Sequence, residues 1–213
     1  MKLYTFYTDT HESMLDDYLR KSINYFGEFD IITKKGQQIS DDGSFYSKGF
    51  HDTVIQKISF LLDEVNWASE EVCVFSDTDI IITKPCKDFF LEQIQEYDIV
   101  FQSDQTSMNT GFFVFRCNNK VKALLEKSLS LVDKHFGDQL CVNAALKDSD
   151  VKYKAFDKTV FNVGFYLKGK LWNGEDTIHF PKRMRVFHAN FMVGLEAKRK
   201  ALEKARERFL KDA

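Results

Sequence analysis

The sequence predicts a single α/β domain built on a mixed, mostly parallel sheet that is flanked by helices. Strand-like apolar segments alternate with segments whose apolar residues recur at helical spacing through the first two-thirds of the chain. The 213 residues are enough to bury one core and fit one domain better than two. The chain has no internal repeat or low-complexity segment, and Pro85 and Pro181 mark no linker.

The first elements follow the order strand, helix, strand. Residues 2–8 (KLYTFYT) predict an opening strand. In residues 14–26 the apolar side chains fall on one helical face, and Gly27 ends this helix. Residues 29–33 (FDIIT) predict a second strand. The polar stretch 34–50 is long enough to be a functional loop, and we expect it to close over a ligand.

The remaining elements continue this alternation. In chain order we expect a helix at 51–66, strands at 71–79, 97–104 and 111–117, helices at 120–136 and 138–147, a short strand at 153–157, and a charged helix at 194–213. We place one domain at residues 1–194. Residues 195–213 are either a solvated terminal helix or a spacer that leads into a further domain.

Composition excludes several classes of function. Hydrophobic residues make up 44% of the chain and charged residues 29%, with a formal net charge of −2, so no general basic field attracts nucleic acid. No stretch approaches the ~20 apolar residues of a membrane span, and the start lacks a signal-peptide pattern. The cysteines are widely spaced, which predicts reduced thiols and a cytoplasmic location: Cys73, Cys86, Cys117 and Cys141.

Two carboxylates stand where a buried strand is predicted to end. Asp77 and Asp79 follow the apolar run VCVF, and carboxylates are costly to bury unless something pairs with them. Ligands of open α/β sheets bind outside the carboxyl ends of the strands. Residues i and i+2 of an extended backbone point the same way, which suits two oxygens that converge on one divalent cation. The alternative is that one of them only caps the next turn.

Two further segments carry polar groups that suit a ligand. Asn109, Thr110 and Gly111 directly precede an apolar strand, where glycine allows close approach. Taken alone, an ordinary strand-entry turn is the better explanation of that motif. Asp138 and Gln139 open a predicted helix, where Asp138 is either an N-cap or faces a polar ligand at the positive end of the helix.

The fourth segment lies near the end of the chain. His188 follows an apolar residue and is followed by Gly194 and Lys198. A lone histidine is more often a structural residue than a ligand. Together, however, the three types suit a diphosphate bound to a metal ion. The imidazole coordinates the ion, the glycine lets the backbone approach phosphate, and the ammonium offsets negative charge.

In this order, the segments FSDTDIIITKP, MNTGFFVF, GDQ and FHANFMVG...K resemble the GT-A nucleotide-diphospho-sugar transferases with their glycogenin and galactosyltransferase relatives. The likeness runs from the first strand to Lys198. It implies a Rossmann-like GT-A fold and a metal-dependent enzyme that moves a hexose or 6-deoxyhexose from a UDP-sugar to a glycan or protein-linked acceptor, with retention. The size and the charged last helix are also similar to a chlorella-virus glycosyltransferase domain, and a viral protein would act in the cytoplasm of its host.

The resemblance implies roles for residues at matching positions. Mn²⁺ or Mg²⁺ would be bound by Asp77, Asp79 and His188, and the diphosphate by Gly194 and Lys198. Contacts with the uracil and ribose of the donor are implied for Phe6, Tyr7, Thr8 and Asp9. Asp77 and Thr78 would lie between the ribose and the sugar, and Lys57 would point toward the donor. The sugar hydroxyls would be bound by Asp104, Asn109 and Asp138.

The implied catalytic residues are Asp79, Asp138 and Gln139, with Gln139 beneath the anomeric carbon. Gln139 is too weak a nucleophile for a covalent intermediate, so we favour same-face attack, with Asp138 as the nucleophile if double displacement occurs instead. The chain departs from the family pattern in the spacing H-x₅-G-x₃-K and in carrying Thr8 and Thr10 where relatives have Asn and Asp.

Two other interpretations of the carboxylate pair remain open at this point. A phosphohydrolase of the aspartyl-phosphate type also uses Asp-x-Asp at a strand end, but it gives the segments around Asn109 and His188 no role. A nucleotide-sugar-binding module without turnover would not need an intact set of metal ligands. The sequence leaves the sugar, the acceptor, the linkage and the oligomeric state undetermined.

Overall fold

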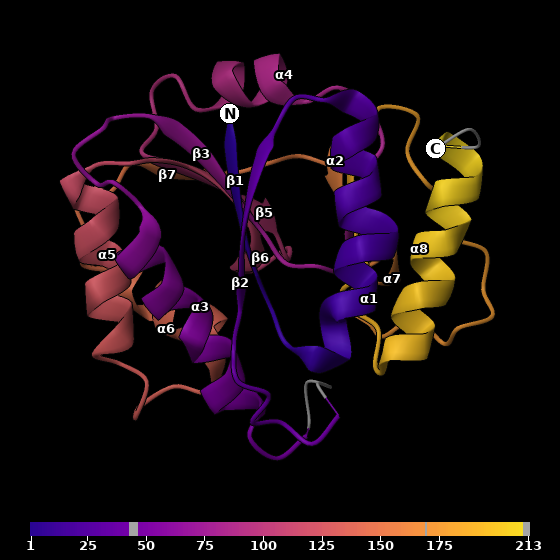
Figure 1. Ribbon diagram of the computed structural model, residues 1–213, viewed down its shortest axis with the longest axis horizontal. Coiled ribbons are helices and arrows are strands. Elements are labelled where there is room, and N and C mark those ends of the chain that lie inside the picture. The colour runs from indigo at the N-terminus through magenta and orange to yellow at the C-terminus, as the bar shows by residue number, and fades with distance from the viewer. Residues whose placement is uncertain (43–46, 169, 211–213) are drawn as a thin grey trace.

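Figure 1 shows the computed structural model, which describes residues 1–42, 47–168 and 170–210. Among these residues, six strands form a central sheet in the order β2-β1-β3-β6-β5-β7. Their bounds are β1 Lys2–Tyr7, β2 Asp30–Lys35, β3 Val72–Ser76, β5 Ile99–Ser103, β6 Met108–Arg116 and β7 Tyr153–Ala155. Strand β6 is antiparallel to β3 and β5, whereas the pairs β1–β2, β1–β3 and β5–β7 are parallel. The predicted mixed, mostly parallel sheet is confirmed.

Helices cover both faces of this sheet, as Figure 1 shows, and two apolar layers lie between the helices and the sheet. Alternate strand residues such as Tyr4 and Phe75 pack against one group of helices, and the residues between them, such as Leu3 and Val74, pack against a second group. This period of two is the pattern of a sheet buried on both faces. The first group is α3 (Phe50–Glu64), α5 (Asn119–Leu129) and α6 (Gly137–Leu146), and the second is the N-terminal helix with α4 (Lys87–Gln93).

A smaller sheet lies beside the second layer in the described part of the chain. Its strands are β4 (Ile80–Ile82), β9 (Val186–His188) and β8 (Val160–Phe161), in the order β4-β9-β8. Because these strands have only two or three residues, no periodicity marks them in the sequence. The register pairs Ile80 with His188, which brings the end of the chain next to the carboxylate pair.

The last helix, α8 (Leu195–Phe209), packs on this region through buried Ala201, Leu202 and Ala205. It belongs to a third apolar cluster that also contains Phe187 of β9 and residues around the short helix α7 (Gly164–Leu167). The charged character of α8 therefore describes its outer face, whereas its small apolar residues bury an inner stripe. The predicted bounds at 194–213 agree with the described part of this helix, and 211–213 lie outside it.

The N-terminal helix begins earlier than predicted. A 3₁₀ turn at Asp9–His11 leads into α1 (Glu12–Met14), a π-helical turn at Leu15–Leu19 and α2 (Arg20–Phe26). Gly27 ends the helix with φ 66°, in the left-handed region, as expected. The prediction missed the first turn because its residues are polar and show no apolar spacing.

Three other boundaries differ from prediction. The motif at 108–111 lies inside β6 and does not precede it, since β6 begins at Met108. Asp77 to Asp79 form a bend between β3 and β4, and not the end of one extended strand. The helix predicted at 120–136 ends at Leu129, and α4 was not predicted.

The described residues contain no helix that is both long and apolar enough to cross a membrane. All four cysteines fall in the described part of the chain, where they are buried and form no disulfide. Part of the loop predicted to close over a ligand, residues 43–46, lies outside the described residues.

Candidate active site

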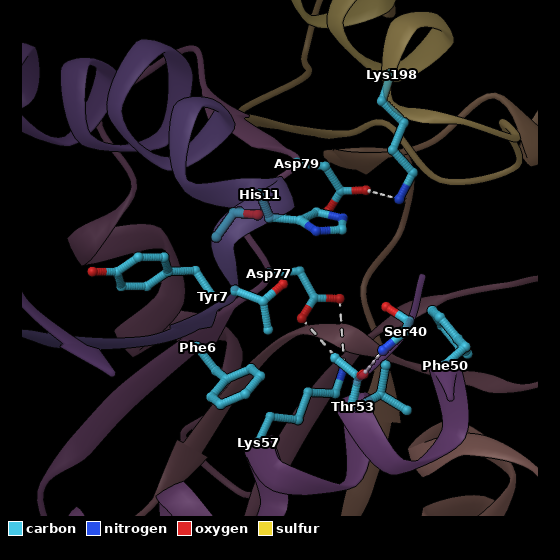
Figure 2. Close-up of a pocket in the computed structure, with 13 residues that line it drawn as sticks. Phe6, Tyr7, His11, Ser40, Phe50, Thr53, Lys57, Asp77, Asp79 and Lys198 are labelled. Atoms are coloured by element: carbon cyan, nitrogen blue, oxygen red, sulfur yellow. Dashed lines mark hydrogen bonds and ion pairs between the residues drawn. The ribbon is translucent and has the colours of Figure 1, made fainter. Parts of the chain in front are cut away.

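A cleft opens at the carboxyl ends of β1 and β3 (Figure 2). Its walls come from the end of β1 and the turn after it, from α3 and the loop before it, from the bend after β3, and from α8. The lining residues are Phe6, Tyr7, Thr8, His11, Ser40, Phe50, Thr53, Val54, Lys57, Asp77, Thr78, Asp79 and Lys198. This is the place where open α/β sheets bind ligands.

The structure brings the three predicted metal ligands together. One ligand atom from each of Asp77, Asp79 and His188 lies within 4.8 Å of the others. The backbone holds them in place, because Asp77 N donates to Gly111 O at 2.7 Å and Ala189 N donates to Asp79 O at 2.9 Å. Asp79 and His188 are buried, whereas the side chain of Asp77 is 31% exposed.

Gly111 lies directly beneath this group. A Cβ added to Gly111 would stand 2.4 Å from His188 Cε1 and 2.6 Å from Asp77 Oδ2, so any other residue would push both ligands away. The glycine of the predicted motif is therefore required by space. The interpretation as an ordinary strand-entry turn is wrong, since the residue lies within β6.

Each carboxylate of the pair contacts its own lysine (Figure 2). Asp77 Oδ1 lies 3.2 Å from Lys57 Nζ, and Asp79 Oδ2 lies 2.8 Å from Lys198 Nζ. Burial opposes ionisation of Asp79, but Lys198 and His188 hold its pKa well below the usual range. Burial raises the pKa of Asp77 against the opposing effect of Lys57, and the nearby charge of Asp79 raises it further.

Asp138 lies beneath the cleft. Its Oδ2 is 2.7 Å from Lys57 Nζ and also accepts a hydrogen bond from the Thr110 hydroxyl. Asp138 borders a small internal cavity, which Lys57 and Thr110 also line, and unlike Lys57 it does not line the cleft. Burial alone would lower the pKa of Lys57, but Asp138 and Asp77 raise this pKa above its ordinary value. The carboxylate expected at the sugar hydroxyls is therefore paired with Lys57 here.

Asp104 is surrounded by side-chain amides. Its Oδ2 accepts from Asn109 Nδ2 at 2.9 Å and from Gln139 Nε2 at 3.1 Å. Its Oδ1 accepts from Asn190 Nδ2 at 3.0 Å and from Asn162 Nδ2 at 3.4 Å. These five residues are called the amide cluster below. Of the three residues expected at the sugar hydroxyls, Asp104 and Asn109 meet, whereas Asp138 contacts Lys57 instead. Gln139 joins Asp104 and Asn109, and Asn162 and Asn190 were missed, because nothing in the sequence pairs them with Asp104.

Phe6, Tyr7 and Thr8, for which contacts with the base and ribose were implied, line the cleft, but Asp9 does not. The Asp9 side chain is 67% exposed and lies 2.8 Å from Lys35. His11 was missed, although its place in a polar run just after the first strand was a usable signal. Burial, with help from Lys198, lowers the pKa of His11 to about 4.

Gly194 precedes α8 with φ 83°, a left-handed conformation that favours glycine, and an added Cβ would meet open space. Its backbone conformation, and not crowding, therefore explains the residue. Lys198 lies one turn into α8 and projects into the cleft toward Asp79 (Figure 2).

Fold and cleft together define an α/β protein of the nucleotide-sugar-transferring class. The chain belongs to the nucleotide-diphospho-sugar transferase family, whose family model matches residues 12–202. The resemblance seen in the sequence is thereby confirmed, and the protein is a glycosyltransferase of the nucleotide-sugar type. No curated protein matches the chain.

Solved structures share the fold at low sequence identity. A glycosyltransferase involved in glycosylation of the major capsid of PBCV-1 superposes with a TM-score of 0.64 at 12% identity, over 95% of this chain and 98% of that one. The glycosyltransferase GlyE of Streptococcus pneumoniae TIGR4 gives 0.60 at 14% identity, over 99% of this chain and 63% of its own. The galactosyltransferase LgtC, in complex with donor and acceptor sugar analogs, gives 0.59 at 9% identity, over 99% and 96%. The predicted GT-A fold is confirmed.

Proposed function

We propose that this enzyme transfers a hexose or 6-deoxyhexose from a UDP-sugar to a glycan or protein-linked acceptor, with a divalent cation at Asp77, Asp79 and His188. The observation that carries the proposal is that Asp77 and Asp79, which line the cleft, converge with His188 from near the end of the chain, with one ligand atom of each within 4.8 Å of the others. In this proposal the anomeric configuration is retained.

The residues fit a divalent cation. Two carboxylates and one imidazole are a donor set that suits Mn²⁺, and Mg²⁺ also accepts carboxylate oxygens. Each carboxylate already contacts a lysine, and a divalent cation between them would also offset the repulsion of the two like charges. Gly111, which has no side chain, does not crowd His188 and Asp77 at this point. When bound, such an ion supplies Lewis-acid stabilisation of the diphosphate leaving group.

The chain's own residues supply the rest of the chemistry. Lys198, one turn into α8, is placed to bind a diphosphate oxygen as negative charge develops on it. Phe6 and Tyr7 line the cleft and offer aromatic surface to a base. The amide cluster, with donors and acceptors in a fixed arrangement, suits the hydroxyls of a sugar.

Burial of Asp138 favours same-face attack over double displacement. Its carboxylate is held by Lys57 and Thr110 beneath the cleft, so it is not free to form a covalent bond to the anomeric carbon. In same-face attack, the leaving diphosphate takes the proton of the acceptor, and Gln139 only lies against the reacting sugar. A phosphohydrolase is not favoured, since Asp77 would have to attack phosphorus while paired with Lys57.

We also propose that the protein acts in the cytoplasm. The support is four buried thiols without disulfides, two of which, Cys73 and Cys117, have sulfur atoms 3.3 Å apart. The 194/195 domain boundary stays a prediction.

Asp79→Ala tests the function directly. We expect loss of both donor turnover and Mn²⁺ dependence, measured as UDP release from a panel of UDP-sugars with and without Mn²⁺. The matched control is Asp16→Ala, which removes an exposed carboxylate that pairs with Arg20 on the helix surface. Unchanged Mn²⁺-dependent UDP release in Asp79→Ala would defeat the proposal. NMR of the first-formed product would show whether the anomeric configuration is retained.

A further inference from the structure

We propose that Gln102 is a positioning residue of the metal site, because its side-chain carbonyl fixes the tautomer of His188. The inference rests on the proposed cation at Asp77, Asp79 and His188. Gln102 lies on β5, eighty-six residues before His188 in the chain, and nothing in the sequence marks it as part of the site.

The contact between the two side chains is short and fully enclosed. Gln102 Oε1 lies 2.6 Å from His188 Nδ1, and the two residues are 0% and 3% exposed. An amide oxygen can only accept a hydrogen bond, so the Nδ1 atom must carry the proton. In the neutral ring the lone pair is then on Nε2.

The Nε2 atom faces the carboxylate pair. It lies 3.3 Å from Asp79 Oδ1, so a lone pair points at a carboxylate oxygen. Only a positive centre between them, a proton or a cation, makes this contact favourable. By holding the proton on Nδ1, Gln102 therefore leaves Nε2 as a ligand atom at the point where the cation is proposed. Metal-binding histidines commonly have such a partner on their second nitrogen.

The backbone of β5 and β6 creates this arrangement. Phe101 pairs with Phe113, but the next residue, Gln102, pairs with Asn109, so β6 carries extra residues between these partners. Gly111 lies in that irregular stretch, against the His188 ring. The register shift thus brings Gln102 and Gly111 to the imidazole together, which is a common use of β-bulges next to active sites.

The other half of the Gln102 amide supports a role for its oxygen. Within the described part of the chain, Gln102 Nε2 is buried without a hydrogen-bond partner. An unsatisfied buried donor costs roughly 1–3 kcal/mol, so a purely structural position would favour an apolar residue here. Turning the amide over would place the His188 proton on Nε2 and would exclude a cation, which is an outcome that experiment can distinguish.

The first test measures Mn²⁺ affinity by EPR of the free ion. We expect Gln102→Leu to bind Mn²⁺ roughly 10–100-fold more weakly than the unmodified protein. Gln102→Glu keeps an acceptor for the Nδ1 proton and adds negative charge, so we expect equal or tighter binding. Thr5→Val is the matched control, because it removes another fully buried, unpartnered polar atom in the described structure, and we expect no change in affinity.

The second test reads the tautomer itself. Long-range ¹H–¹⁵N NMR of the Mg²⁺-loaded protein, with His188 assigned from His188→Gln, should show the proton on Nδ1 in the unmodified chain and in Gln102→Glu. A proton on Nε2 would overturn the inference. The inference would also be overturned if the unmodified protein and Gln102→Leu bound Mn²⁺ with equal affinity. If Gln102→Leu fails to fold, Gln102→Glu decides, and weaker Mn²⁺ binding by that variant would overturn the inference.

The two levels of the proposal fail differently. If the unmodified protein binds neither Mn²⁺ nor Mg²⁺, the proposed function falls and this inference with it. If the unmodified protein binds the ion and loss of the Gln102 carbonyl makes no difference, only the inference about Gln102 falls.

Discussion

Two adjacent parts of the site differ in how their carboxylates are paired: one part uses lysines and the other uses neutral amides. The charged half contains Asp77, Asp79 and Asp138, which contact Lys57 and Lys198 at 2.7 to 3.2 Å. The amide cluster contains one carboxylate, Asp104, whose oxygens accept four neutral amide donors. The two halves meet at β6 and β9, where Asn109 is two residues from Gly111 and Asn190 is two residues from His188.

The difference shows what each half can bind. Buried ion pairs cost more to break than to keep, so the charged half keeps its geometry until another cation or anion replaces a partner. Such a site suits a metal ion with a diphosphate. The amide cluster presents fixed donors and acceptors with little charge, which suits neutral hydroxyl groups. Mutations in the two halves should therefore affect different measurements.

Breaking the charged half should have the largest effect on stability. Lys57→Met leaves Asp77 and Asp138 without the ammonium that both contact, and Asp138 is 6% exposed. Loss of one partner of a buried ion pair typically costs about 3–5 kcal/mol. We expect a fall of this size in the free energy of unfolding, measured by urea denaturation in the presence of a chelator.

The double variant Lys57→Met/Asp138→Asn is the control. The Asp138→Asn change removes one of the two stranded charges, and the new amide oxygen can still accept from the Thr110 hydroxyl, so part of the lost stability should return. A single variant as stable as the unmodified protein would mean that the ion pairs contribute nothing to the fold.

Breaking the amide cluster should affect the reaction and leave metal binding unchanged. Asp104→Asn replaces one acceptor oxygen by a donor that faces two amide donors, and hydrogen bonds to charged groups contribute roughly 1.5–3 kcal/mol. If the cluster binds the sugar, the rate of donor turnover should fall by about 10–100-fold. Mn²⁺ affinity should stay within about twofold.

These two measurements separate the halves. A parallel loss of turnover and Mn²⁺ affinity in Asp104→Asn would show that the cluster supports the metal site. Unchanged turnover would remove the cluster from the reaction. Unfolding curves recorded beside the kinetics would show whether the variant is folded.

The sequence predicted the residues of the charged half better than their partners. Asp77, Asp79 and His188 could be found because the segments that contain them follow one another in an order that resembles a known family. The pairing of Asp138 with Lys57 could not be found, since it depends on where α3 and α6 lie on the sheet. Motif residues follow from local sequence, whereas their partners follow from packing.

The same limit explains what was missed in the fold and in the cluster. The central sheet was predictable from apolar periodicity, but β8 and β9 are too short to show any. Gln102 reaches His188 through a shift in strand register, and Asn162 and Asn190 reach Asp104 across 58 and 86 residues of sequence. No local pattern encodes such contacts.

His11 differs from its charged neighbours, because it is a neutral base that lies beside the charged half. Its ring lies near Asp79 and Lys198 in the cleft (Figure 2), and its Nδ1 is 2.9 Å from the Thr10 hydroxyl. Burial and the positive charge of Lys198 lower the pKa of His11 from 6.5 to about 4. The folded protein therefore keeps this ring uncharged at neutral pH.

This shift predicts a smaller, pH-dependent effect on stability. As the pH falls below 6.5, the ring takes up a proton in the unfolded chain, but in the folded protein it stays neutral until the pH nears 4. The stability from this shift is thus present above pH 6.5 and is lost progressively below it. Between pH 7 and pH 5 the unmodified protein should lose about 2 kcal/mol more than His11→Gln, in which no imidazole titrates at this position. The comparison uses urea denaturation of chelator-treated samples of both proteins at pH 7 and pH 5. Equal losses in the free energy of unfolding would mean that His11 takes up a proton as readily in the folded cleft as in the unfolded chain.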